Sequence, residues 1–123
     1  MSVDKTQFGL TEENDRFMAD IEEMDLFSDQ AEAAKFAMSL AIRSGVELGS
    51  MTGANTKWHS RGFDKTGEIA ALICALYPDT DTPYRAIEFF VNRGLEILRE
   101  HKRVTGEIDL AALMTPDSPS ING

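Results

Sequence analysis

Apolar residues recur at spacings of three and four along most of this chain, a spacing that places them on one face of an α-helix. The pattern covers four segments, at residues 11–24, 28–45, 64–77 and 82–101. A helix with one apolar face gains stability by burying that face against another element. The pattern therefore predicts a mainly α fold built from four helices.

Residues that favour helix ends support these boundaries. Thr11 suits the N-cap of the first helix, and either Ser28 or Asp29 that of the second, since their side-chain oxygens can accept a hydrogen bond from an N–H of the first turn. Thr82 is also a suitable cap, and Pro83 after it lacks only an N–H that the first turn leaves unpaired. Pro78 ends the third helix, because its ring disfavours helical backbone at the preceding residue.

The apolar faces also indicate which side chains form the core. On the third helix Ile69, Leu72, Ile73 and Leu76 align on one face. Cys74 lies beside this stripe, and free cysteine is among the most frequently buried residues. We therefore expect the stripe and Cys74 to pack in the interior.

The adjacent pair Phe89 and Phe90 has two interpretations. Neighbouring residues of a helix point about 100° apart, so the two rings cannot share one narrow stripe. Either one ring contacts a second surface, such as an oligomer interface, or the core face is broad enough for both.

The two halves of the chain follow the same order of elements. The extended segment KTQFGL precedes the first pair of helices, and NTKWHS precedes the second pair. Ser28 and Thr82 then hold equivalent positions at the start of the second helix of each pair. We interpret residues 1–105 as one domain with an internal repeat, whose halves cover residues 3–45 and 55–103.

Strand–helix–turn–helix is the order of the ribbon-helix-helix family, and each half resembles one such unit. In that family two units pair their strands into an antiparallel ribbon that enters the DNA major groove, and their helices share a core. The resemblance implies a pseudo-dimer within one chain, with a short two-stranded ribbon. Gly9 departs from the pattern, since glycine weakens a strand.

Strand alternation assigns the two faces of this ribbon. Successive side chains of a strand point to opposite faces, so with Phe8 and Trp58 inward the outer residues are Lys5, Gln7, Lys57 and His59. Lysine can donate to guanine, and glutamine can bond adenine through both its donor and its acceptor. With Arg61 these are the candidate DNA-binding residues; the alternative is an ordinary solvated strand.

A second resemblance concerns the phrases FAMSLAIRSG and NRGLEIL. They are similar to those of small bacterial accessory proteins associated with DNA phosphorothioation and phage defence. This resemblance covers much of the chain, but it implies no catalytic residues.

Composition narrows the function further. Twelve Lys and Arg against 21 Asp and Glu give a formal charge of −9, which opposes general adhesion to nucleic acid or anionic lipid. The acidic run DIEEMD lacks the ligand pattern of a calcium loop, and neither histidine has a second metal ligand at zinc spacing. GSMTGAN lacks the Gly-Lys-Ser/Thr of a phosphate-binding loop. We expect no enzyme activity and no cofactor.

The expected cellular setting follows from the same features. The single cysteine fits a reducing compartment, and the chain has neither a signal-peptide pattern nor a membrane-spanning run, so we expect a cytoplasmic protein. Residues 106–123 end in TPDSPSING and are expected to form a flexible tail.

These expectations combine into two hypotheses of function. The first is a small non-catalytic bacterial regulator that binds DNA through its ribbon, as a homodimer. The alternative is an acidic protein–protein interaction subunit of a bacterial defence or DNA-modification complex, which binds a basic partner and makes no direct DNA contact.

Overall fold

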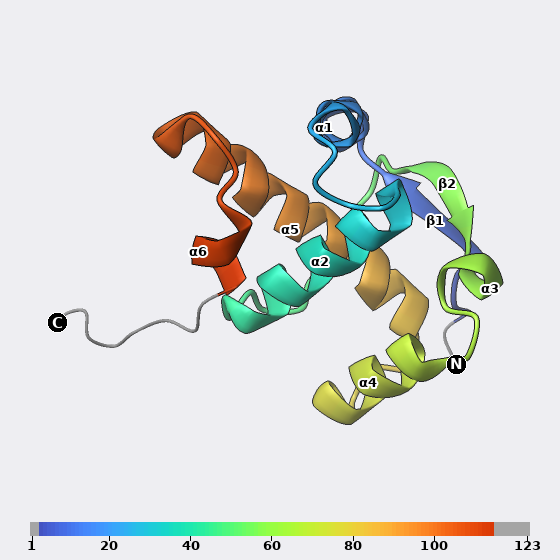
Figure 1. The fold of residues 1–123 in the computed structure, drawn as a ribbon. Helices are drawn as coiled ribbons and strands as arrows, with labels where there is room; N and C mark the ends of the chain where they lie inside the picture. The colour runs from blue at the N-terminus through green and yellow to red at the C-terminus, as the bar shows by residue number, and fades with distance from the viewer. Residues whose placement is uncertain (1–2, 115–123) are drawn as a thin grey trace, which may run out of the picture.

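The computed structural model describes residues 3–114, and within them the chain is mainly helical with one small sheet (Figure 1). In chain order the elements are β1 (Gln7–Leu10), α1 (Glu12–Glu23), α2 (Gln30–Arg43), β2 (Asn55–His59), α3 (Ser60–Phe63), α4 (Glu68–Leu76), α5 (Pro83–Thr105) and α6 (Leu110–Met114). The expected mainly α class with a short ribbon is confirmed. The short helices α3 and α6 add to the four predicted ones.

The first two helices begin where their capping residues predict. Thr11 Oγ1 accepts a hydrogen bond from the Asn14 N–H at 3.2 Å, and an Asp29 carboxylate oxygen accepts one from the Glu32 N–H at 2.8 Å. Each bond satisfies a donor of the first turn that has no partner within the helix. The sequence signals are therefore sufficient to define these two starts.

The start of α5 differs from the prediction. Pro83 is its first residue, but the Thr82 side chain makes no capping hydrogen bond. Asp4 caps this helix instead: its two carboxylate oxygens accept from the N–H groups of Tyr84 at 2.9 Å and Arg85 at 3.0 Å. A residue about eighty positions away thus replaces the local cap.

Helices α2 and α5 pack directly on each other at the centre of the molecule (Figure 1). Gly94 lies at their closest approach, where a Cβ atom would come within 1.8 Å of the Ala37 carbonyl oxygen. Only the absence of a side chain allows the two backbones to come this near. Ala37 and Val91 are both fully buried here.

Strands β1 and β2 pair antiparallel, so the two extended segments form the predicted ribbon. Gln7 lies opposite His59 and Phe8 opposite Trp58, and the register then shifts after Phe8. At this irregularity a Cβ on Gly9 would lie 1.7 Å from the Asn55 carbonyl oxygen. The glycine that departs from the family pattern is therefore needed for the close approach of the two strands.

The other edge of β1 is closed by side chains of α5. The Gly9 N–H donates to Glu88 Oε2 at 3.0 Å, and Asn92 Nδ2 donates to the Gly9 carbonyl at 3.0 Å. Asn92 Oδ1 also accepts from the Thr11 N–H at 3.0 Å. Glu88 and Asn92 are buried and lie one helical turn apart, so they substitute for a third strand.

Two predictions about α4 are wrong. Leu72 and Leu76 are 49% and 48% exposed, and Cys74 is exposed as well. The helix contacts α5 through a narrower stripe, in which Ile73 is fully buried and Ile69 half-buried. This nine-residue helix lies at the edge of the core with α5 as its main neighbour, so much of its surface stays uncovered.

The structure favours the broad-core interpretation for the two adjacent phenylalanines. Phe89 and Phe90 are both buried, with 9% and 0% exposure, and their rings meet edge to face at 5.4 Å. The segment after α2 covers the first ring, since a Cβ on Gly49 would lie 3.2 Å from the Phe89 ring. Neither ring is left for a second surface.

Within the expected tail, residues 106–114 are described and include α6. The Arg43 guanidinium holds this short helix, because it donates to the carbonyl oxygens of Leu113 and Met114. Residues 115–123, the rest of that prediction, lie outside the described residues.

Candidate nucleic-acid interface

Four of the five predicted DNA-binding residues are exposed on the ribbon or directly after it. Gln7 and His59 are opposite each other in the strand register, and both are exposed. Lys57 is on the same strand as His59, and Arg61 follows at the start of α3. The His59 Nδ1 accepts a hydrogen bond from the Arg61 N–H at 3.2 Å, which defines the turn from strand to helix.

The fifth residue, Lys5, has a different role. Its ammonium lies 2.6 Å from Glu88 Oε1, and the Glu88 side chain is only 4% exposed. Breaking such a pair would leave a buried carboxylate without its counter-charge, which is strongly unfavourable. Lys5 therefore neutralises Glu88 and secures β1 to α5.

Lys57 is also paired, but its partner is exposed. Its ammonium lies 2.8 Å from Asp15 Oδ1, and the Asp15 side chain is 53% exposed. Ion pairs in such solvent-exposed positions contribute little to stability. Another anion can consequently replace Asp15 at small cost.

Carboxylates occupy the helix ends at which a phosphate would be expected to bind. The start of α5 is bonded to Asp4, and the start of α2 is bonded to Asp29. Backbone N–H groups and the helix dipole make such N-termini favourable for anions. Here these groups are used within the chain, which limits the contacts available to a DNA backbone.

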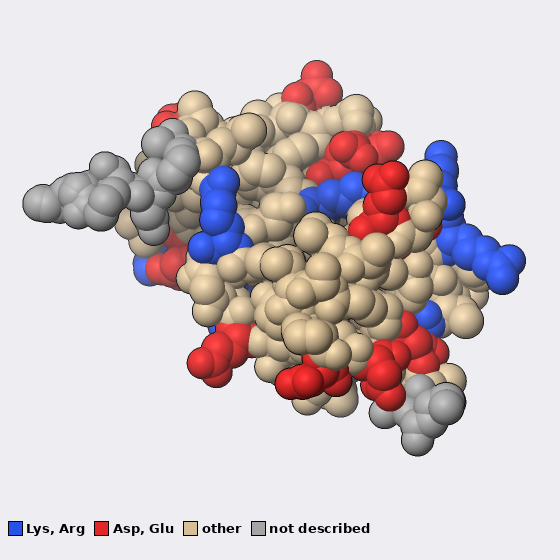
Figure 2. Space-filling model, turned by 90° about the horizontal axis from the view of Figure 1, so that it is seen from below, with Lys and Arg blue, Asp and Glu red and all other residues tan. Residues whose placement is uncertain are grey.

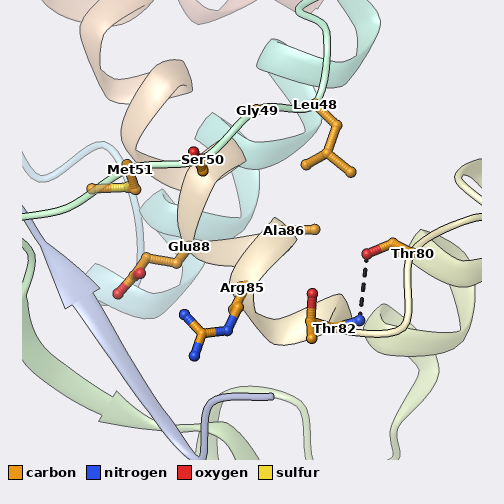
Figure 3. Close-up of a pocket in the computed structure, with 9 residues that line it drawn as sticks. All are labelled: Leu48, Gly49, Ser50, Met51, Thr80, Thr82, Arg85, Ala86 and Glu88. Atoms are coloured by element: carbon orange, nitrogen blue, oxygen red, sulfur yellow. Dashed lines mark hydrogen bonds between the residues drawn. The ribbon is translucent and has the colours of Figure 1, made fainter. Parts of the chain in front are cut away.

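A hollow lies between the segment after α2 and the start of α5 (Figure 3). Its polar lining includes Ser50, Thr80, Thr82, Arg85 and Glu88. The Thr82 N–H donates to Thr80 Oγ1 at 3.4 Å, as drawn in the figure. Both Glu88 oxygens already accept hydrogen bonds, one from the Lys5 ammonium and one from the Gly9 N–H.

No metal centre is evident in the part of the chain that the structure describes. Among residues 3–114 no three His, Cys, Asp or Glu side chains lie close enough to hold an ion. Within the same residues no helix has the length and apolar character needed to cross a bilayer.

A second surface, which the sequence reasoning missed, is the exposed side of α4. Figure 2 views the molecule from the side on which α4 lies, and uncharged residues cover the centre of this face. Acidic residues follow its lower border and also lie above its centre, while lysine and arginine lie toward its left and right margins and beside the upper acidic group. The signal was present in the sequence, because the helix is apolar from Ile69 to Leu76 without a polar side.

The start of α4 is held firmly in place. The Asp64 carboxylate accepts from the N–H groups of Ile69 at 3.0 Å and Ala70 at 2.9 Å, and from the Tyr84 hydroxyl at 3.1 Å. Burial and the hydrogen bond to Asp64 raise the pKa of the Tyr84 phenol. The hydrogen bonds that Asp64 accepts therefore connect α4 to the first turn of α5.

Comparison of the chain with protein-family models, with curated proteins and with solved structures found no match. The class that the fold defines is thus a mainly helical protein with a small antiparallel ribbon, and any function is inferred from the geometry itself.

Proposed function

We propose that this protein is a small non-catalytic regulator that contacts DNA through the outer face of the β1–β2 ribbon. The observation that carries the proposal is the antiparallel pairing of two segments about fifty residues apart, with Gln7 and His59 exposed side by side. A two-stranded ribbon has the width to enter the major groove. The ribbon-helix-helix resemblance of each half supports the same reading.

Each residue has a distinct role in this proposal. Gln7 reads a base edge, since an amide can bond adenine N6 and N7 together. Lys57 exchanges Asp15 for a phosphate, and Arg61 contacts the backbone beside it. Lys5 does not contact DNA in this proposal, because its ammonium remains paired with the buried Glu88 carboxylate.

The proposal predicts weak, salt-sensitive binding. Two phosphate contacts per chain, from Lys57 and Arg61, give a log–log salt slope of about −2. The formal charge of −9 adds repulsion at long range. Binding is therefore to be sought at low ionic strength.

The test is fluorescence anisotropy of a short labelled duplex at low salt, comparing Lys57→Glu with Lys102→Glu. Both changes alter net charge equally, but Lys102 lies in the last turn of α5, away from the ribbon (Figure 1). We expect Lys57→Glu to weaken binding and to reduce the salt slope by roughly 1, while Lys102→Glu leaves both unchanged. Absence of binding by the unaltered protein, or equal losses in both variants, would contradict the proposal.

The second candidate is an acidic interaction subunit of a bacterial defence or DNA-modification complex, without direct DNA contact. The observation that favours it is the occupation of two helix N-termini by Asp4 and Asp29, which removes sites for phosphate. Its test is affinity purification from the native host. Recovery of a basic protein by the unaltered chain and equally by Lys57→Glu, together with no DNA binding in the anisotropy assay, would favour this candidate.

A further inference from the structure

Helix α1 begins with an acidic turn directly after the first strand of the ribbon. This turn carries Glu12, Glu13 and Asp15, and Thr11 alone separates the helix from β1. Carboxylates at this end of a helix complement the positive end of its dipole, so they are favourable within the chain. A DNA phosphate that approaches the ribbon meets them as like charges.

Asp15 connects this acidic turn to the second strand. Lys57 Nζ lies 2.8 Å from Asp15 Oδ1, although 42 residues separate the two in the chain. Glu13 is engaged elsewhere, since one of its carboxylate oxygens lies 3.3 Å from Arg99 Nη1. The Asp15 pair therefore holds a candidate DNA-binding side chain against α1 through a tertiary contact.

A carboxylate and a phosphate compete for the same ammonium. Both offer anionic oxygens that accept charge-assisted hydrogen bonds from a lysine Nζ. The Lys57 and Asp15 side chains are 28% and 53% exposed, so another anion can reach the pair from solvent. While the pair is closed its charges cancel, and the ribbon lacks one of the two cations assigned to the DNA backbone.

We propose that Asp15 is an autoinhibitory residue, whose carboxylate occupies Lys57 in place of a DNA phosphate and so lowers the affinity of the ribbon for DNA. The inference rests on the proposed function, because it concerns the same cation. Binding of DNA exchanges one anionic partner of Lys57 for another: the Asp15 carboxylate is released to solvent, and a phosphate oxygen takes its place. Asp15 thus sets the affinity without contacting DNA.

The size of the effect follows from the exposure of the pair. Exposed ion pairs are weak, so freeing Lys57 should raise DNA affinity by about threefold and not by orders of magnitude. Salt screens an exposed pair, so this gain should shrink as ionic strength rises. Loss of general repulsion follows the same trend, and only a matched charge change nearby separates the two causes.

The test is fluorescence anisotropy of the labelled duplex at low salt, comparing Asp15→Asn with Glu12→Gln. Both variants lose one negative charge from the same exposed turn with little change in shape, but only the first loses the partner of Lys57. We expect Asp15→Asn to bind about threefold more tightly than the unaltered protein, and Glu12→Gln less than about 1.5-fold more tightly. Circular dichroism checks that both variants keep the fold.

A double-mutant cycle shows whether Asp15 acts through Lys57. In the Lys57→Gln background, Asp15→Asn should raise affinity no more than Glu12→Gln does. An equal gain from Asp15→Asn with and without Lys57 would overturn the inference, because the effect would then be general repulsion.

The same titrations separate failure of this inference from failure of the proposed function. DNA binding that Lys57→Gln weakens, with equal affinities for Asp15→Asn and Glu12→Gln, would overturn the autoinhibitory role and leave the ribbon as the DNA contact. Absence of DNA binding by the unaltered protein and by Asp15→Asn would overturn both. Binding by Asp15→Asn alone would support both.

Discussion

At the scale of single residues, two glycines determine how closely parts of the backbone approach. Gly9 lies against the Asn55 carbonyl in the ribbon, and Gly94 lies against the Ala37 carbonyl where α2 crosses α5. Both clashes that a Cβ would make are with backbone atoms, which cannot rotate away as a side chain can. The two sites therefore tolerate no larger residue without movement of a whole element.

The change Gly94→Ala tests this requirement. We expect it to lower the free energy of unfolding by about 3 kcal/mol, because the added methyl must push α2 and α5 apart. Urea denaturation followed by circular dichroism measures the loss. The control is Gly62→Ala, where a Cβ meets nothing within 4 Å, and we expect a change below about 0.5 kcal/mol. Equal midpoints for the two variants would mean that the helix crossing is looser than described.

At the scale of elements, local signals define most helix starts, but α5 depends on a distant residue. The sequence offers Thr82 as its cap, yet the N–H groups of its first turn donate to Asp4, which precedes β1. A carboxylate at this position also complements the positive end of the helix dipole. The segment before β1 and the start of α5 are thereby tied together.

Substitution of the two candidate caps distinguishes them. We expect Asp4→Ala to cost about 1 kcal/mol of unfolding free energy, as removal of a capping carboxylate typically does. Thr82→Ala should cost less than half as much, because its side chain makes no capping bond. Thermal and urea unfolding of the two variants gives the comparison, and a larger loss from Thr82→Ala would show that the local cap is the stabilising one.

At the scale of the whole molecule, buried polar side chains of α5 join segments from the two halves of the chain. Asn92 bonds the Gly9 carbonyl, the Thr11 N–H and the Asn14 side chain, while Glu88 bonds the Gly9 N–H and Lys5. These bonds satisfy the edge of β1 that β2 does not cover. The ribbon is therefore mounted rigidly on the helical core.

The change Asn92→Ala should show how much these hydrogen bonds between β1 and α5 contribute to the free energy of unfolding. It leaves the Gly9 carbonyl and the Thr11 N–H without their partner in a buried setting, and we expect a loss of roughly 2–4 kcal/mol. Asn55→Ala, at an exposed position of β2, should change stability by less than about 0.5 kcal/mol. Denaturant titrations of both variants provide the measurement; a small loss for Asn92→Ala would mean that water replaces its hydrogen bonds.

Much of the architecture could be predicted from local pattern. The periodicity of apolar residues located the four longer helices, and strand alternation placed Phe8 inward and His59 outward. The candidate site was less accessible to such reasoning. Lys5 and Lys57 look equivalent in the sequence, but one faces a buried carboxylate and the other an exposed one.

The sequence by itself determined the positions of the four longer helices and the two ribbon strands, because backbone hydrogen bonding and side-chain periodicity act between residues close in the chain. Only the tertiary structure decided that Asp4 caps α5, that Lys5 forms an ion pair with Glu88, and that Leu72 stays exposed. These outcomes depend on which surfaces meet between segments as much as 83 residues apart. A local sequence pattern does not determine how one helix is rotated about its axis when it packs against another, and this rotation decides which side chains are buried.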